Sequence, residues 1–191
     1  MIPKYYKKTA ITLGVFLIQL LAFGQEKLIK DMDNDGVKDT IKFNRAELTI
    51  VCKLSTHNFK PLFSKQMETI GVGNSAGIET TRNGFLFYID YENGGFKNRF
   101  RYNPKTKNIQ LIGMNLYERE KNKKRVEAES NVNLLTGDFI GNTTFYGVEN
   151  LRAIKAKMHF KIINLDDFSD EIFLDYSKRC GELYEKTKRI N

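Results

Sequence analysis

The chain has 191 residues and a formal net charge of +8 at pH 7. Its length suits one domain with a substantial core, and the lack of an internal repeat argues against a complete propeller or solenoid. A mildly basic surface favours solubility and attracts anionic partners such as phosphate-bearing lipids or glycans.

Residues 1–24 have the pattern of a secretory signal peptide. Lysines precede an apolar run from Ala10 to Phe23 that ends in small residues. A membrane anchor is the alternative, but the run is shorter than the roughly 20 apolar residues of a bilayer span. We therefore expect a mature chain, residues 25–191, that is secreted to the periplasm or the extracellular space without a membrane span. Its charge falls to +5, because the signal holds three lysines and no acid. Nucleic acid is not an expected partner of an exported chain.

The segment from residue 31 to residue 39 predicts a calcium loop. Carboxylates recur at alternate positions, as in known loops that bind through positions 1, 3, 5, 7 and 9, and Gly36 stands at the sharp turn. The expected ligands are the side chains of Asp31, Asp33, Asp35 and Asp39 and the carbonyl oxygen of Val37. Position 12 is Lys42 instead of the glutamate of helix-flanked loops, so we expect a strand on each side. An acidic surface turn without metal is the alternative interpretation.

Alternation of apolar and polar residues predicts antiparallel strands over most of the remaining chain. The expected strands cover residues 48–54, 85–91, 96–102, 109–117, 126–134, 139–146 and 154–162. Asn93-Gly94 predicts a hairpin turn, while residues 55–83 are less regular. From about 170 to 188 the apolar residues follow helical spacing. The pattern predicts a mainly β fold, an antiparallel β-sandwich or partly closed barrel of seven to nine strands with a C-terminal α-helix.

Two cysteines, Cys52 and Cys180, fall on faces expected to be buried. An oxidising compartment permits a disulfide between them. A bridge over so long a loop would stabilise the fold by roughly 4–5 kcal/mol in the chain-entropy model. Two buried free thiols are the alternative.

No recognisable catalytic constellation is present, so we predict a binding protein and not an enzyme. The two histidines form no pair with a cysteine at zinc spacing, and no serine has the context of a nucleophile elbow. The acidic residues near 166–171 suit the start of a helix. Lys97, Arg99 and Arg101 form a basic row that suits an outward sheet face, or an anionic glycan or lipid.

Small residues between 70 and 84 predict a contact loop presented by a rigid sheet. The candidate partner-binding residues are Gly71, Gly73, Asn74, Ser75 and Ala76.

Several short motifs follow the calcium loop in a characteristic order. They are Ile70-Gly71-Val72-Gly73, Phe85-Leu86-Phe87-Tyr88-Ile89, Asn98-Arg99-Phe100-Arg101-Tyr102, Leu111-Ile112-Gly113 and Asn133-Leu134-Leu135-Thr136-Gly137. In this order, over about residues 28–140, they resemble calcium-binding periplasmic immunity proteins that protect bacteria from secreted peptidoglycan hydrolases. That family is similar in fold to the β-rich periplasmic lysozyme inhibitors. The calcium loop by itself also resembles those of integrin-type propeller repeats.

The resemblance implies a protein partner, a cell-wall hydrolase, that is bound by a loop inserted into its cleft. A basic lysozyme is a poor target, because a chain of charge +5 would repel it at long range. The alternative function is a structural or adhesive envelope module that binds anionic glycan or lipid through its basic strand faces.

Overall fold

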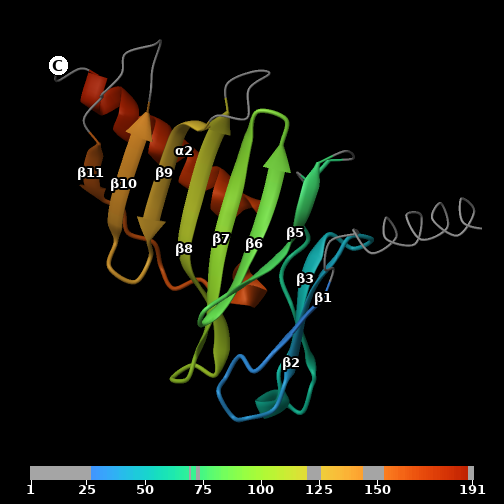
Figure 1. Ribbon diagram of the computed structural model, residues 1–191. Helices are drawn as coiled ribbons and strands as arrows, with labels where there is room; N and C mark the ends of the chain where they lie inside the picture. Colours follow the sequence, from blue (N-terminus) through green and yellow to red (C-terminus); the bar gives the residue numbers. More distant parts are fainter. Residues whose placement is uncertain (1–26, 69, 72–73, 120–125, 144–152, 189–191) are drawn as a thin grey trace, which may run out of the picture.

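Two antiparallel sheets and one C-terminal helix make up the described part of the chain (Figure 1). The computed structural model describes residues 27–68, 70–71, 74–119, 126–143 and 153–188. The expected signal peptide, residues 1–24, lies outside them. The mainly β fold class is confirmed, and within these residues the sheets do not close into a barrel.

The smaller sheet has four strands in the order β1-β2-β3-β4. They are β1 (Lys27–Lys30), β2 (Asp39–Asn44), β3 (Thr49–Lys53) and β4 (Pro61–Phe63), with the short 3-10 helix η1 (Ser55–His57) before β4. Each strand pairs with its neighbour in the sequence, so only short connections are needed. The acidic segment is the connection between β1 and β2, which confirms the expected order of strand, loop and strand. In Figure 1 this loop and η1 lie at the end of the molecule away from the C-terminal helix.

The larger sheet has seven strands in the order β11-β10-β9-β8-β7-β6-β5. They are β5 (Ser75–Thr81), β6 (Gly84–Tyr91), β7 (Gly94–Asn103), β8 (Asn108–Arg119), β9 (Val126–Asn133), β10 (Asp138–Thr143) and β11 (Ile154–Lys157). The predicted hairpin is present, because Tyr91 pairs with Gly94 and leaves two residues in the turn. A side chain at Gly94 would collide with the carbonyl oxygen of Tyr117, so the close approach of β8 requires glycine there.

The described residues form eleven strands, more than the seven to nine expected. The additional strands, β4 and β5, lie in the stretch that the sequence left irregular. Both are edge strands. β4 has only three residues and begins with a proline, which edge positions tolerate. Such strands depend on a neighbouring strand more than on their own alternation pattern.

The strand expected over 154–162 ends at Lys157. The chain then leaves β10 and crosses to β8, where Leu111 N donates a hydrogen bond of 2.9 Å to the carbonyl oxygen of Ile163. This crossing shifts the alternation, so Ile162 is 65% exposed whereas Ile163 is only 6% exposed. The clean pattern in the sequence therefore continued past the end of the strand. The short 3-10 helix η2 (Leu165–Asp167) follows.

Aromatic rings join the two sheets and the helix into one core. Phe168, fully buried, lies 5.0 Å from Phe100 and 6.2 Å from Phe87 between ring centroids, in edge-to-face geometry. It also lies 6.3 Å from Phe173 of the helix. Phe43 of the smaller sheet lies 5.1 Å from Phe87 of the larger one. Edge-to-face rings add stability beyond their buried area.

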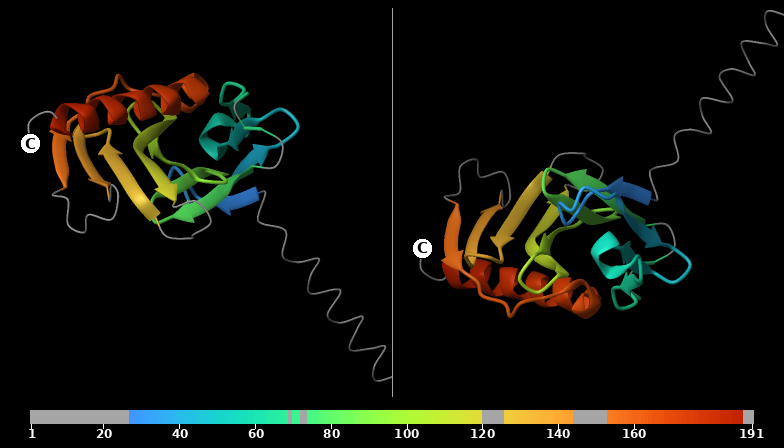
Figure 2. Two further views of the ribbon diagram at one scale, coloured as in Figure 1. Left: turned by 90° about the horizontal axis from the view of Figure 1, so that it is seen from above. Right: turned by 90° about the horizontal axis from the view of Figure 1, so that it is seen from below.

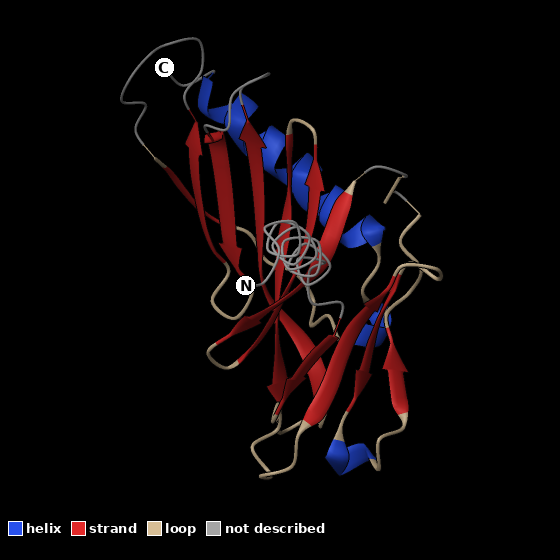
Figure 3. Cartoon of the chain, turned by 45° about the vertical axis from the view of Figure 1, so that its right-hand side comes forward, coloured by secondary structure: helices blue, strands red, loops and turns tan. Residues whose placement is uncertain are grey.

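The helix α2 (Asp170–Lys188) agrees with the expected bounds. It packs along one face of the larger sheet, and the smaller sheet lies beyond its N-terminal end (Figures 2 and 3). Its buried face carries Phe173, Tyr176 and Cys180, as the helical spacing predicts. The Tyr184 and Ser130 hydroxyls lie 2.9 Å apart and tie the helix to β9.

Candidate metal centre

Three of the predicted ligands converge at the end of the smaller sheet. One carboxylate oxygen from each of Asp31, Asp33 and Asp39 lies within 4.8 Å of the other two. Pairing of Lys30 with Asp39 in the β1–β2 ladder brings the two ends of the loop together. The sheet register therefore positions Asp31 and Asp39, and the loop conformation positions Asp33.

Two residues with positive φ turn the loop. Asn34 has φ 62° and Gly36 has φ 87°, as the sequence predicts for the glycine. The Asp31 carboxylate stabilises both turns, since it accepts hydrogen bonds from Asn34 N at 2.7 Å and from Gly36 N at 3.0 Å. Side chains of this type often hold the backbone of a tight turn in this way.

Asp39 is completely buried at the start of β2. Its carboxylate accepts two backbone hydrogen bonds, from Met32 N at 2.7 Å and from Ser55 N at 2.8 Å. A buried carboxylate requires such partners, because charge-assisted hydrogen bonds offset part of its lost hydration. Asp39 thereby connects the metal loop with η1.

Only one of the two carboxylate oxygens of Asp33 accepts a hydrogen bond from the described residues. Its Oδ2 accepts a 2.6 Å hydrogen bond from the Thr56 hydroxyl. Its Oδ1 is shielded from solvent and has no hydrogen-bond partner among the described residues. A buried polar atom without a partner is costly, and an ion is one of its ordinary explanations. This oxygen belongs to one of the three converging carboxylates.

Asp35 does not join the other three carboxylates. Its two oxygens accept hydrogen bonds from Ser55 Oγ at 2.6 Å and from Val37 N at 2.8 Å. The hydrogen bond from Ser55 is the main reason that the pKa of Asp35 lies below its ordinary value. The structure thus gives Asp35 a bracing role across the loop, although spacing alone makes it a ligand. The role of the Val37 carbonyl stays a prediction.

Ser55 and Thr56 of η1 are parts of this centre that the sequence did not predict. Their hydroxyls donate to Asp35 and Asp33, across 20 and 23 residues of sequence. A Ser-Thr pair directly after a buried strand is common in sequences and indicates no particular partner. Only the β2–β3 pairing brings η1 beside the loop.

The candidate partner-binding loop is partly a strand. Gly71 and Asn74 are described and precede β5, whereas Gly73 lies outside the described residues. Ser75 and Ala76 begin β5 and pair with Asp90 and Ile89. Ala76 is only 2% exposed and lies in the core, so its side chain is not on the surface, and its place in a partner-binding loop stays a prediction.

Cys52 and Cys180 are free, buried thiols, the second of the two alternatives. Cys52 lies in β3 and Cys180 in α2, and both belong to the core. Burial raises the pKa of Cys180 to about 11 and that of Cys52 further. Both thiols therefore act as small apolar groups.

The converging carboxylates offer hard oxygen ligands of the kind that calcium takes. With three negative charges so close, a cation would also relieve their repulsion. Within the described residues, no helix is long and apolar enough to cross a membrane. Comparisons with family models, with curated proteins and with solved structures give no significant match.

Proposed function

We propose that the chain is an exported calcium-binding β-domain that acts by binding another molecule and not by catalysis. One observation carries the calcium part of this proposal. Three carboxylates converge within 4.8 Å, and one of them holds a buried oxygen, Asp33 Oδ1, that has no partner among the described residues. The cation would be the partner of that oxygen.

Calcium is the cation that best suits this ligand set. All the candidate ligands are oxygens, and the loop contributes no histidine or cysteine that would favour zinc. The lack of a glutamate at position 12 favours a modest dissociation constant of about 10⁻⁵–10⁻³ M. Such a site would be filled outside the cell, where calcium is plentiful.

The ion would stabilise the end of the smaller sheet. Asp33 and Asp39 both accept hydrogen bonds from the segment Ser55–Thr56 as well as lying in the acidic cluster. Holding these carboxylates together would therefore fix η1 against the β1–β2 loop. Because the site requires the folded chain, binding of calcium adds directly to the free energy of unfolding.

Thermal unfolding with and without calcium tests the metal site. We expect 2 mM Ca²⁺ to raise the melting temperature and a chelator to reverse the increase. Asp33→Asn should weaken calcium binding by roughly tenfold or more, since even outer contacts of a metal site have effects of this size. Asp35→Asn is the matched control, because it removes the same charge from the same loop outside the converging set.

If neither millimolar calcium nor chelator changes the melting temperature, the calcium site is excluded. Equal losses of affinity in the two variants would show that only the overall charge of the loop matters. Calorimetric titration of the native protein and of both variants gives these affinities.

The favoured partner is a cell-wall hydrolase. The order of short motifs supports this choice by resembling periplasmic immunity proteins. Among the described residues, Gly71 and Asn74 before β5 and the exposed Ser75 at its start remain the candidate contact residues, whereas Ala76 is buried. A peptidoglycan turbidity assay with muramidases tests the proposal. We expect the native protein to slow a target enzyme and Asn74→Trp to abolish the inhibition, with Glu182→Trp, an exposed position on α2, as control.

If the native protein slows no muramidase at micromolar concentration, the inhibitor function should be abandoned. The second candidate, an envelope module for anionic glycan or lipid, would then replace it. The exposed row formed by Lys97, Arg99 and Arg101 on β7 favours that candidate. A pull-down from envelope extract separates the two: recovery of a muramidase supports the first function, and recovery of polysaccharide supports the second.

A further inference from the structure

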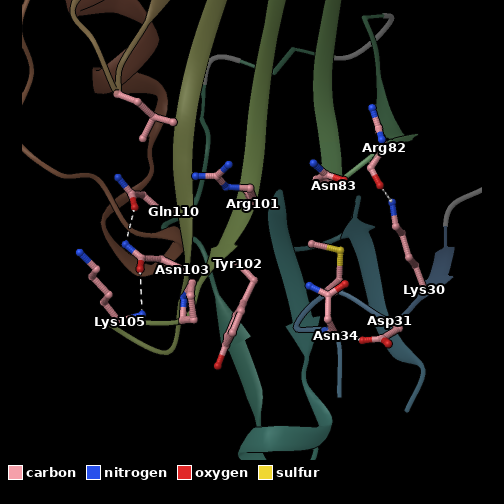
Figure 4. A pocket seen from close by; sticks show the side chains of 13 residues that line it. Lys30, Asp31, Asn34, Arg82, Asn83, Arg101, Tyr102, Asn103, Lys105 and Gln110 are labelled. Carbon is pink, nitrogen blue, oxygen red and sulfur yellow. Dashed lines mark hydrogen bonds between the residues drawn. The ribbon is translucent and has the colours of Figure 1, made fainter. Parts of the chain in front are cut away.

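Several connections between strands, the start of the metal loop among them, line a cleft (Figure 4). The lining comes from the start of the metal loop, the turn between β5 and β6, the turn between β7 and β8, and Leu135 of the turn between β9 and β10. The volume is about 650 Å³, within the range of small-molecule sites. The cleft lies where the two sheets approach each other, and residues far apart in the sequence line it.

Positive charge dominates this cleft. Four cationic residues line it, Lys30, Arg82, Arg101 and Lys105, against one acid, Asp31. The carboxylate of Asp31 accepts hydrogen bonds from the backbone of its own loop. The cleft therefore favours an anionic ligand.

The cations have different roles. The Lys30 ammonium donates to the carbonyl oxygens of Thr81 and of Arg82, the latter at 2.9 Å, so it fixes the β5–β6 turn. The side chains of Arg82, Arg101 and Lys105 have no hydrogen-bond or ion-pair partner in the described part of the chain. Arg101 is also exposed. An exposed guanidinium without a hydrogen-bond partner in the protein can bind a carboxylate through two parallel hydrogen bonds.

Uncharged polar groups and an aromatic ring stand among the cations. Asn103 is braced by its side chain, which donates to Gln110 Oε1 at 2.7 Å and accepts from Lys105 N at 3.0 Å. Asn83 of the β5–β6 turn is exposed, and Tyr102 at the end of β7 is half-buried (Figure 4). Amides suit hydroxyl groups, and a tyrosine ring offers a flat apolar surface with a polar end.

We propose that this cleft binds an acidic saccharide, with Arg101 holding a sugar carboxylate. The amides and Tyr102 then contact the hydroxyl groups and the ring of the sugar. A simple inorganic anion would contact the cations alone, whereas a sugar would also contact the exposed amide of Asn83 and the ring of Tyr102. The proposal rests on the envelope-module function and names its ligand and its site.

Calorimetric titration of the mature protein with a hyaluronan tetrasaccharide tests the proposal. Chitotetraose is the neutral control, and succinate supplies two carboxylates without a sugar. We expect binding of the acidic saccharide that weakens as salt increases, and little or no binding of either control. Arg101→Gln should lower the affinity roughly tenfold or more, because it removes charge-assisted hydrogen bonds.

Lys42→Gln is the matched control variant. Lys42 is exposed on β2, lies outside the basic row of β7, and does not line the cleft. The substitution removes the same charge as Arg101→Gln, so the affinity for the tetrasaccharide should change no more than about twofold by long-range electrostatics. Melting curves of both variants should match the native curve, which excludes a loss of folding.

Three results would overturn the proposal. They are no binding of the tetrasaccharide at millimolar concentration, equal losses of affinity in Arg101→Gln and Lys42→Gln, and succinate binding as tight as that of the tetrasaccharide. Repeating the titration with calcium and with chelator, beside melting curves, separates the two sites. If calcium raises the melting temperature but no saccharide binds, only the proposal for the cleft is contradicted. If the saccharide binds but calcium does not raise the melting temperature, only the proposal for the metal site is contradicted.

Discussion

Aromatic rings fill the interior beside α2, whereas carboxylates connect the chain segments at the opposite end of the molecule. Phe168 contacts rings from two strands and from the helix. At the other end Asp33, Asp35 and Asp39 accept hydrogen bonds from the segment Ser55–Thr56. Burial of apolar area needs no ion, while clustered carboxylates repel one another unless a cation joins them. The two ends of the molecule should therefore respond differently to calcium.

Loss of the central ring should give the largest effect. Phe168→Ala is expected to lower the free energy of unfolding by about 3–5 kcal/mol, through lost burial and the cavity left behind. Urea denaturation measures the change, which should be the same with calcium and with chelator. Phe63→Ala is the control, because Phe63 on edge strand β4 is 46% exposed. Similar losses in the two variants would contradict the central role of Phe168.

Withdrawal of calcium should have the next largest effect, and it should be local. For a dissociation constant of 10⁻⁵–10⁻³ M, 2 mM Ca²⁺ contributes about 0.7–3 kcal/mol by mass action. Hydrogen exchange should then accelerate at the amides of Met32 and Ser55, which donate to Asp39. Amides in β7 and β8 should be much less affected. Uniform acceleration would show that the metal end and the aromatic end open together.

Asp138, a surface carboxylate on β10, should show a smaller, purely local effect. A hydrogen bond of 2.6 Å from Lys157 is the main reason that the pKa of Asp138 lies below its ordinary value, and Thr136 contributes next. Since this pKa is depressed in the folded state, the stabilisation exists above the unfolded pKa. It disappears as the pH falls through the folded pKa.

Replacing Lys157 tests this account. Lys157→Met should return the pKa of Asp138 towards its ordinary value, as an NMR titration would measure. Lys155→Met, at an exposed position on the same strand, should leave that pKa nearly unchanged. An unchanged Asp138 pKa in the Lys157 variant would contradict the assigned cause.

Reductant should have no effect on stability at all. Cys52 and Cys180 are free thiols, so thiol titration of the denatured, unreduced protein should find two groups. In the folded protein both should be unreactive near neutral pH, because both are buried and their pKa values are raised. A melting temperature that falls on reduction would mean that the two thiols are bridged in solution.

The sequence predicted the features that depend on nearby residues. The bounds of α2, the β6–β7 hairpin and the glycine turn at Gly36 all agree with the structure. The exposure of Lys97, Arg99 and Arg101 beside buried Phe96 and Phe100 also agrees. Each of these features follows from side-chain period or from backbone freedom over a few residues.

The same local pattern failed wherever a partner segment decides the structure. Residues 55–83 show no clear alternation of apolar and polar side chains, yet β4 and β5 form there. They form because β3 and β6 offer them hydrogen bonds. Because of that missing alternation, Ala76 was expected to be in a contact loop. The alternation after Lys157 continued in the sequence although the chain had already crossed to β8. Pairing over long distances leaves little trace in a short window of sequence.

The sequence by itself determined that carboxylates would gather between two strands, because spacing and a glycine are local properties. Only the tertiary structure decided which of them converge: Asp31, Asp33 and Asp39 do, while Asp35 turns to Ser55. The cleft lined by Arg82, Arg101 and Lys105 is likewise a product of tertiary structure. Its walls come from separate turns, and these meet only because register and packing fix how the two sheets approach each other.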